Sequence, residues 1–277
     1  LEAVNILQTH IISFAAMVPS TLSLLRPYFG KILLPELCFS VLCWEPFPEE
    51  LASSWSSCIP NARIVNISGP TEITLACMGY EVDPTFENNA THNGILAFGH
   101  PWKNTTAMVV DEQLNEVPDE VAGELCFAGN HVMEGYLGQP EVNRRVFFRK
   151  ATQGKQKRFY RTGDLAYVKD GIFYTCGRKD LQVKIQGHKV ELEEIEFVSR
   201  RLLKHQFAYA LAGVREGGAK EICLVVKGDK GDARKIKEQL RQHLPPYMLP
   251  NSIKFVDELP YNANGKIDRM ALQKLFT

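Results

Sequence analysis

The spacing of apolar residues changes twice along this chain of 277 residues, and the two changes divide it into three parts. In residues 1–93, apolar runs alternate with helical patterns. The run Ile11–Val18 precedes a helical pattern through Leu22 and Leu25, and the run Cys38–Cys43 has the length and composition of a buried strand. This spacing predicts an α/β fold for the first part.

The second and third parts follow different patterns. In residues 94–179, short strand candidates such as ELCFAG (124–129) are separated by turn-rich pieces, which is typical of an all-β sandwich or a small barrel. In residues 180–277, a helix over 191–204, a hairpin, a second helix and a closing strand follow one another. The sequence therefore predicts an α/β part, a β-rich part like a distorted barrel, and a small α+β domain.

The composition excludes several classes of protein. The 32 basic and 32 acidic residues give a net charge of +0, which argues against nucleic acid as the main partner. The seven cysteines are scattered without a CxxC spacing, which favours a reducing, cytoplasmic compartment over a disulfide framework or a zinc site. No run approaches the ~18 consecutive apolar residues of a membrane-spanning helix, so membrane insertion is not expected.

The first motif that carries chemistry is SGPTE, which follows a predicted strand directly. Gly69 and Pro70 make a tight turn, Thr71 offers a hydroxyl, and Glu72 offers a hard oxygen ligand for Mg²⁺. Read alone, the pentad is more often a plain turn from a strand into a loop.

Two further motifs combine turn formers with charge. YRTGD ends in Asp164, and an aspartate after Thr-Gly at a turn can accept two hydrogen bonds from a ribose diol, although by itself the motif reads as an Asx-turn. GRKD begins with Gly177 and Arg178, and this arginine can bind ribose or phosphate. Asp180 stands where the β-rich part meets the last part, so it can act as a hinge.

The helix that follows is strongly acidic, because its start reads ELEEIE. Acidic residues in a first turn suit the helix dipole, so we expect no catalytic role for Glu191, Glu193, Glu194 or Glu196.

One lysine near the C-terminus stands out in LPYNANGKIDR. Lys266 directly follows the turn formers Asn264 and Gly265. Most lysines beside turns are simply solvated. A lysine presented by such a turn can also reach a phosphate or carboxylate and stabilise negative charge that develops in a transition state.

The order of these motifs is more specific than any one of them. GPTE, YRTGD, GRKDLQVKIQG, ELEEIE and NGKIDR in succession resemble the AMP-forming adenylating superfamily of acyl-CoA synthetases, luciferases and peptide-synthetase adenylation domains. The resemblance runs from about Phe14 to the end of the chain. QVKIQGHKVELEEIE, GYLGQPE and YMLP are similar to the amino-acid-activating branch, above all to the D-alanine:D-alanyl carrier protein ligases.

The resemblance implies a fold and a reaction. Residues 1–179 would be the C-terminal part of a large domain, and 180–277 a mobile lid. The carboxylate of a small amino acid like D-alanine would attack the α-phosphate of ATP, giving an acyl-adenylate and releasing pyrophosphate, with Mg²⁺ present. The lid would then rotate, and the thiol of a phosphopantetheinylated carrier protein, or of CoA, would take the acyl group.

The resemblance also implies a role for each motif residue. Lys266 would be catalytic during adenylation only, and Glu72 would hold the metal ion. Asp180 would be the hinge, and Gly187 would lie near the thiol channel. Cys43 and Trp44 would wall the substrate pocket, together with residues 18–20. The nucleotide would be bound by Ser68, Gly69, Pro70, Thr71, Asp164 and Arg178.

Three departures from the family pattern bear on activity. Ser68 stands where the family usually has a tyrosine that packs on adenine, and Trp44 stands where it usually has a glycine. The tryptophan can replace the lost ring or block the site, and the sequence leaves both open. The family's lysine-containing phosphate loop and the aspartate that holds the substrate amine are not among these residues, and Leu1 starts mid-pattern, so we expect a fragment.

Two alternatives to an amino-acid ligase stay open. One is a catalytically drifted member that serves as a binding module, favoured by Ser68 and Trp44 but opposed by the intact Glu72, Asp164 and Lys266. The other is an acyl-CoA or aryl-CoA ligase of the same superfamily, against which ELEEIE and Cys43 argue weakly.

Overall fold

The chain folds into two compact units, which are described one at a time. In this computed structural model the described residues are 2–152, 154–185, 188–204, 207–214, 220–228, 231–262 and 266–274. The first unit is Leu1–Cys176 and the second is Gly177–Thr277. The finer division into 1–93, 94–179 and 180–277 stays a prediction.

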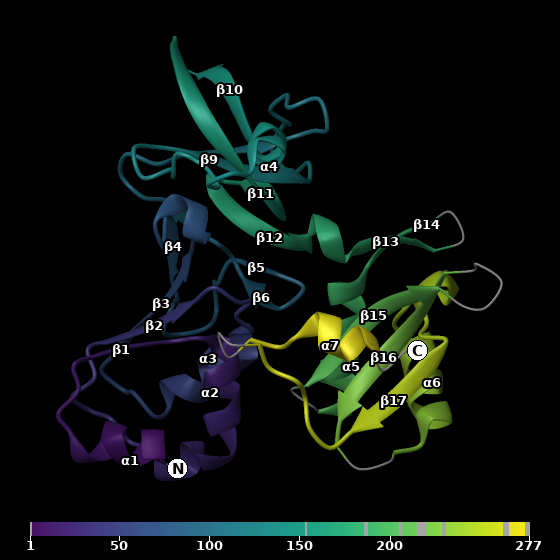
Figure 1. Ribbon diagram of the computed structural model, residues 1–277. Coiled ribbons are helices and arrows are strands. Elements are labelled where there is room, and N and C mark those ends of the chain that lie inside the picture. The colour runs from purple at the N-terminus through teal and green to yellow at the C-terminus, as the bar shows by residue number, and fades with distance from the viewer. Residues whose placement is uncertain are drawn as a thin grey trace. The chain divides into compact units, whose positions relative to one another are not determined.

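A five-stranded mixed sheet organises the start of the first unit, with strand order β1-β2-β3-β4-β7. β1, β2 and β3 are parallel, and helices α2 and α3 lie between them in sequence, as the predicted α/β pattern requires. Figure 1 shows β1 to β4 side by side. The elements are α1 (Glu2–Thr9), β1 (Phe14–Met17), α2 (Pro19–Leu25), η1 (Arg26–Lys31), β2 (Phe39–Cys43), α3 (Glu49–Ser56), β3 (Arg63–Ser68), η2 (Thr71–Ile73), β4 (Met78–Glu81), β5 (Thr91–His92), β6 (Ile95–Leu96) and β7 (His100–Pro101).

One apolar core joins α2 and α3 to this sheet. Leu22 of α2, Leu51 of α3 and Leu42 of β2 belong to the same buried cluster. Trp55 of α3 is fully buried in that cluster, and its indole N–H donates to the hydroxyl of Ser40 at 3.0 Å. The cluster therefore holds both helices on one face of the sheet.

The β-rich part of the first unit is a second sheet of five strands. Its order is β10-β11-β9-β8, with β12 paired to β11, and within the described residues it stays open rather than closing into a barrel. Residues 147–152 and 155–160 pair as a hairpin of β10 and β11. The elements are β8 (Thr106–Val110), β9 (Gly123–Ala128), α4 (Pro140–Val146), β10 (Phe147–Thr152), β11 (Lys155–Lys169) and β12 (Ile172–Arg178).

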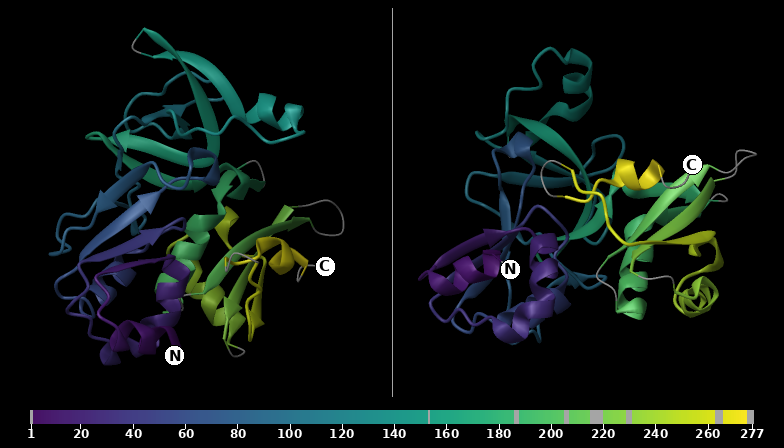
Figure 2. Two further views of the ribbon diagram at one scale, coloured as in Figure 1. Left: turned by 60° about the vertical axis from the view of Figure 1, so that its left-hand side comes forward. Right: turned by 60° about the horizontal axis from the view of Figure 1, so that its bottom comes forward.

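The second unit is built around a three-stranded sheet whose two faces carry different clusters. Along β15 and β16, Ala210 and Leu224 face one cluster, whereas Leu211 and Val225 face the other, as the period of two in a strand dictates. Figure 2 shows helices on both sides of this sheet. The elements are η3 (Lys179–Leu181), β13 (Gln182–Ile185), β14 (His188–Glu191), α5 (Leu192–Leu203), β15 (Ala208–Val214), β16 (Lys220–Lys227), α6 (Ala233–Arg241), η4 (Pro246–Met248), β17 (Ser252–Val256) and α7 (Arg269–Gln273).

Helix α6 begins with a capped first turn. The carboxylate of Asp232 accepts hydrogen bonds from the backbone N–H groups of Arg234 and Lys235 at 2.9 and 3.2 Å, so it caps α6. α5 has 12 residues, and among the described residues no helix has the length and apolar character needed to cross a membrane. The predicted fold class, with an α/β part, a β-rich part and a small α+β unit, is confirmed.

Replacing Trp55 with alanine tests the core beneath the first sheet. The change leaves a large cavity and an unpaired Ser40 hydroxyl, so we expect the free energy of unfolding to fall by about 3–5 kcal/mol. Urea denaturation followed by circular dichroism measures this loss. Leu33→Ala, at a side chain that is 61% exposed in the same unit, is the control and should change it little. Equal losses in the two variants would contradict the assigned core.

Candidate functional site

The loop that leaves β3 is held by a close approach of two backbone segments. The N–H of Cys77 donates to the carbonyl oxygen of Ser68 at 2.9 Å, so the chain returns to the strand end after one short turn, η2. A β carbon on Gly69 would lie 2.6 Å from the Cα of Ala76 and 2.9 Å from the Cys77 nitrogen. Only glycine fits here, which gives the glycine of SGPTE a structural reason.

Glu72 is tied to the loop that precedes α4. Its carbonyl oxygen accepts from the N–H of Met133 at 2.9 Å, and its carboxylate accepts from the hydroxyl of Tyr136. Burial, followed by the hydrogen bond to Glu72, raises the pKa of Tyr136. Burial and the hydrogen bond to Tyr136 likewise raise the pKa of Tyr160. Both phenols therefore stay protonated, and Glu72 lies beside two hydroxyl groups.

Tyr136 is itself fixed by Asn143 of α4. The Asn143 side chain accepts from the Tyr136 N–H at 2.8 Å and donates to the Tyr136 carbonyl oxygen at 2.9 Å. In the sequence, GYLGQPE was only a family motif, and its contact with Glu72 was missed. No spacing signal could have found it, because the two residues are 64 positions apart.

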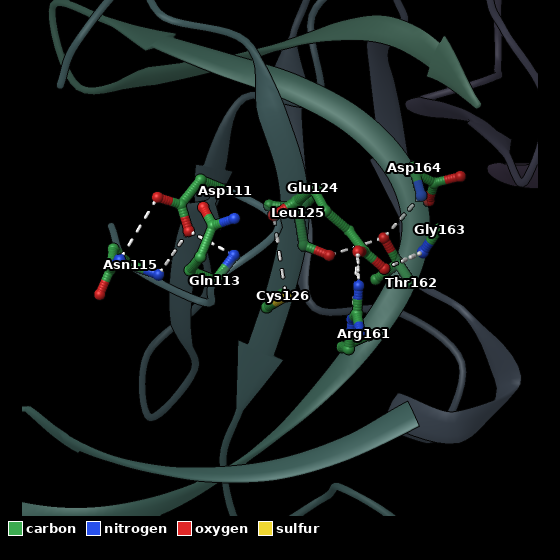
Figure 3. Close-up of polar contacts among 10 residues, drawn as sticks. All are labelled: Asp111, Gln113, Asn115, Glu124, Leu125, Cys126, Arg161, Thr162, Gly163 and Asp164. Atoms are coloured by element: carbon green, nitrogen blue, oxygen red, sulfur yellow. Dashed lines mark hydrogen bonds and ion pairs between the residues drawn. The ribbon is translucent and has the colours of Figure 1, made fainter. Parts of the chain in front are cut away.

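Asp164 lies in a bulge inside a strand. YRTGD belongs to β11, and the pairing with β9 shifts register between Arg161 and Leu165. Gly163 has φ +75°, a conformation that glycine adopts freely. The Asp164 N–H donates to the hydroxyl of Thr162 at 2.9 Å. A bulge breaks the ladder and re-aims a side chain, and here it turns the Asp164 carboxylate away from the neighbouring polar cluster (Figure 3).

A buried glutamate on the next strand supports this bulge. Glu124 of β9 accepts from the N–H of Gly163 at 3.3 Å and from the guanidinium of Arg161 at 2.5 and 3.1 Å (Figure 3). The Thr162 hydroxyl donates to the carbonyl oxygen of Leu125 at 2.7 Å. These bonds satisfy the backbone that the register shift leaves unpaired. Glu124 carries no motif, so the sequence did not single it out.

The structure brings the SGPTE loop and the Asp164 bulge together around Cys77. Burial and the nearby charge of Asp164 raise the pKa of the Cys77 thiol to about 12. The same thiol donates to the carbonyl oxygen of Ser68 at 3.7 Å. Two motifs almost a hundred residues apart therefore meet at one place in the first unit.

The two predicted pocket residues lie at the end of β2. Cys43 is the last residue of the strand, and Trp44 follows it. Cys43 is buried, and its thiol donates to the carbonyl oxygen of Met17 at 3.5 Å, so the ends of β1 and β2 are adjacent. Trp44 has φ +63°, which glycine adopts more readily. Its indole is 42% exposed and donates to the carbonyl oxygen of Leu75 at 3.0 Å. The last registered pair of β2 and β3 is Cys43 with Ile67, so Trp44 and Ser68 are the next residues on the two segments.

The other predicted residues belong to the second unit and are described within it. Arg178 is exposed at the end of β12, Asp180 lies in the short turn η3, and Gly187 lies outside the described residues. Lys266 is half-buried on a hairpin, with its N–H donating to the Asn262 side chain at 3.0 Å and its carbonyl oxygen accepting from the Asn262 N–H at 2.7 Å. The predicted turn formers Asn264 and Gly265 lie outside the described residues.

A buried ion pair in the second unit was missed by the sequence reasoning. Glu196 is 2% exposed and lies beyond the first turn of α5, so the helix dipole is not its main partner. Its carboxylate accepts from Arg269 at 2.7 Å. Burial opposes the charge of Arg269, and Glu196 more than offsets this, so the pKa of the guanidinium is raised.

Comparison with known proteins identifies the family. The model of the AMP-binding enzyme matches residues 2–137, and that of the AMP-binding enzyme C-terminal domain matches residues 209–266. The chain therefore belongs to the AMP-binding enzyme family, which confirms the resemblance to the adenylating superfamily.

Curated relatives are similar over about half of their own length. A D-alanine--D-alanyl carrier protein ligase of Bacillus velezensis is 34% identical over 253 residues, which are 89% of this chain and 49% of the relative. One of Bacillus licheniformis is 33% identical over 272 residues, which are 96% of this chain and 52% of the relative.

Solved structures show the same fold. A four-domain nonribosomal peptide synthetase bound to AMP and glycine has a TM-score of 0.82 and 29% identity, covering 98% of this chain and 20% of that one. IdnL7 has a TM-score of 0.82 and 26% identity, covering 99% of this chain and 52% of that one.

Replacing Gly69 with alanine tests the close approach at the loop. The new methyl group must push the backbone at Ala76 and Cys77 away, so we expect a loss of about 1–3 kcal/mol in the free energy of unfolding. Thermal and urea unfolding measure it. Gly30→Ala is the matched control, because nothing lies within 4 Å of a β carbon there. A Gly69 variant as stable as the Gly30 variant would contradict this account of the loop.

Proposed function

We propose that this chain is the C-terminal part of an ATP-dependent ligase that adenylates an amino acid and transfers it to a thiol. The observation that carries the proposal is the meeting of the SGPTE loop and Asp164 around Cys77, in a chain of the AMP-binding enzyme family. A turn that only glycine can make and a half-buried carboxylate at its side suit a nucleotide better than a plain turn does.

In this proposal the first unit binds the nucleotide. The backbone of Ser68, Gly69, Pro70 and Thr71 would line adenine and the α-phosphate. Asp164 would accept hydrogen bonds from the ribose hydroxyls, because its carboxylate points away from the Glu124–Arg161 pair (Figure 3).

Glu72 fits a single carboxylate ligand of Mg²⁺. Among the described residues no three His, Cys, Asp or Glu side chains gather to hold a metal ion, so the protein would supply little more than this one carboxylate. That agrees with Mg²⁺, which is usually held by one or two carboxylates with substrate phosphates and water. When bound, the ion would neutralise phosphate charge. The chain's own part is to hold the Glu72 carboxylate in place through Tyr136.

The second unit would supply groups that act in turn. Lys266 would stabilise the charge that develops between the substrate carboxylate and the α-phosphate during adenylation. Arg178 would assist at the ribose, Asp180 would be the hinge of a mobile lid, and Gly187 would lie near the path of the thiol. Lys266 would thus act in adenylation and move away from the site before transfer to the thiol.

The proposed substrates come from the curated relatives and the pocket strands. A small amino acid such as D-alanine fits the relatives' names, and Cys43 and Trp44 would wall its pocket. The relatives' names also favour a phosphopantetheinylated carrier protein over CoA as the acceptor.

A catalytically drifted binding module is the second candidate. The observation that favours it is Trp44, which keeps a left-handed backbone at a non-glycine residue and places an exposed ring beside the loop.

Exchange of labelled pyrophosphate into ATP by the full-length protein, with small amino acids present, separates the two candidates. We expect exchange in the wild type and a loss of at least ~100-fold in Lys266→Ala, because its charge acts in the transition state. Lys235→Ala, at an exposed lysine of α6, is the control. Absence of exchange with every amino acid would favour the binding module, and exchange that does not depend on Lys266 would remove its catalytic role.

The metal assignment is tested by titrating Mg²⁺ in the same assay. For Glu72→Gln we expect the concentration that gives half-maximal exchange to rise ~10-fold, which corresponds to about 1.4 kcal/mol of cation binding. Glu112→Gln, at an exposed glutamate of the same unit, should behave as the wild type. An unchanged Mg²⁺ requirement in Glu72→Gln would exclude Glu72 as a ligand.

A further inference from the structure

The outer edge of β15 is covered by side chains instead of a strand. β15 is at the end of the sheet, in the order β15-β16-β17. The N–H of Ala210 donates to the carboxylate of Glu196 at 3.0 Å, and the Ala210 carbonyl oxygen accepts from the guanidinium of Arg269 at 3.3 Å. The carbonyl oxygen of Ala212 accepts from the side chain of Gln273 at 2.8 Å. Polar side chains thus occupy positions where a neighbouring strand would otherwise pair.

The ion pair between Glu196 and Arg269 connects the elements on the two faces of the sheet around this edge. Glu196 projects from α5, whose apolar residues belong to one cluster, and Arg269 begins α7, whose Leu272 belongs to the cluster on the other face. Arg269 approaches Glu196 at 2.7 Å, and Arg200 approaches the second carboxylate oxygen at 3.7 Å. A carboxylate this deeply buried is stable only when it is fully paired.

The hairpin that carries Lys266, with described residues 260–262 and 266–268, is called the lysine hairpin. It leads directly into Arg269 of the ion pair. Lys266 lies three positions before Arg269, and the two residues between them are both fixed. Ile267 packs against the cluster that contains Leu211. The N–H of Asp268 donates to the carbonyl oxygen of Pro260 at 2.9 Å and closes the base of the hairpin.

We propose that Glu196 and Arg269 are positioning residues for Lys266: their buried pair clamps the base of the lysine hairpin to β15. The inference rests on the proposed function, because it assigns the pair to the half-reaction in which Lys266 acts. A displacement of about 1 Å in a catalytic group can cost ~100-fold in rate. Loss of the clamp therefore reduces adenylation and leaves transfer to the thiol intact.

Two half-reactions of the full-length protein separate positioning from general support. Adenylation is measured by pyrophosphate exchange, and transfer by mixing chemically prepared aminoacyl-adenylate with pantetheine. For Glu196→Gln we expect exchange to fall by ~10- to 100-fold and transfer to stay within about twofold of the wild type. Arg201→Gln, at an exposed arginine of the same helix, is the matched control and should keep both rates. Equal losses in the two half-reactions, or none, would overturn the proposal.

A measurement of hydrogen exchange tests the clamp without relying on activity. The N–H groups of Asn262, Lys266 and Asp268 are hydrogen-bonded within the hairpin. In Glu196→Gln we expect these three amides to exchange at least ~10-fold faster, while the amides of β16 keep their protection. Unchanged protection of the hairpin would refute the clamp, even if the wild type showed no pyrophosphate exchange and the proposed function failed.

A second pair of variants covers the case in which Glu196→Gln does not fold. Arg269→Lys keeps the charge but loses the second donor, whereas Arg269→Gln loses the charge. We expect exchange to be lowest in Arg269→Gln and partly restored in Arg269→Lys. Equal exchange in these two variants at the wild-type rate would overturn the proposal.

Discussion

The first unit depends on the contact between the backbone of Gly69 and that of Ala76 and Cys77. Because no β carbon fits there, the chain can leave β3, make one short turn and return to the strand end. The turn carries Glu72 to Tyr136, and the return places Cys77 next to Asp164. The nucleotide site that we propose combines two distant motifs, and it depends on this close approach.

Both units place a buried glutamate where a strand is irregular or unpaired. Glu124 supports the bulge that turns Asp164 out of the ladder of β11, and Glu196 supports the open edge of β15 behind the lysine hairpin. In each case the carboxylate accepts a backbone N–H and pairs with an arginine, Arg161 or Arg269. A buried charge costs several kcal/mol unless it is paired in this way, so these glutamates fix one backbone conformation beside each proposed functional residue.

Much of the fold could be predicted, because it follows from the spacing of apolar residues over short stretches of the chain. The buried strand at β2 and the helix α5 follow from an apolar run and from helical spacing. The bulge at Asp164 could not be predicted, because it depends on the pairing of β11 with β9. The glycine usual at Trp44 has a visible reason in its left-handed backbone, although the sequence could not show that conformation.

The sequence alone determined the type and order of the elements and the membership of an adenylating family, because short-range periodicity and ordered motifs are properties of neighbouring residues. It also singled out Glu72, Asp164 and Lys266 as candidate functional residues. Only the tertiary structure decided which side chains hold them. Glu124 lies in no motif, and the motifs that contain Tyr136 and Glu196 do not show what these side chains contact. Each of the three acts on a residue or a strand edge that is distant along the chain and near only after folding.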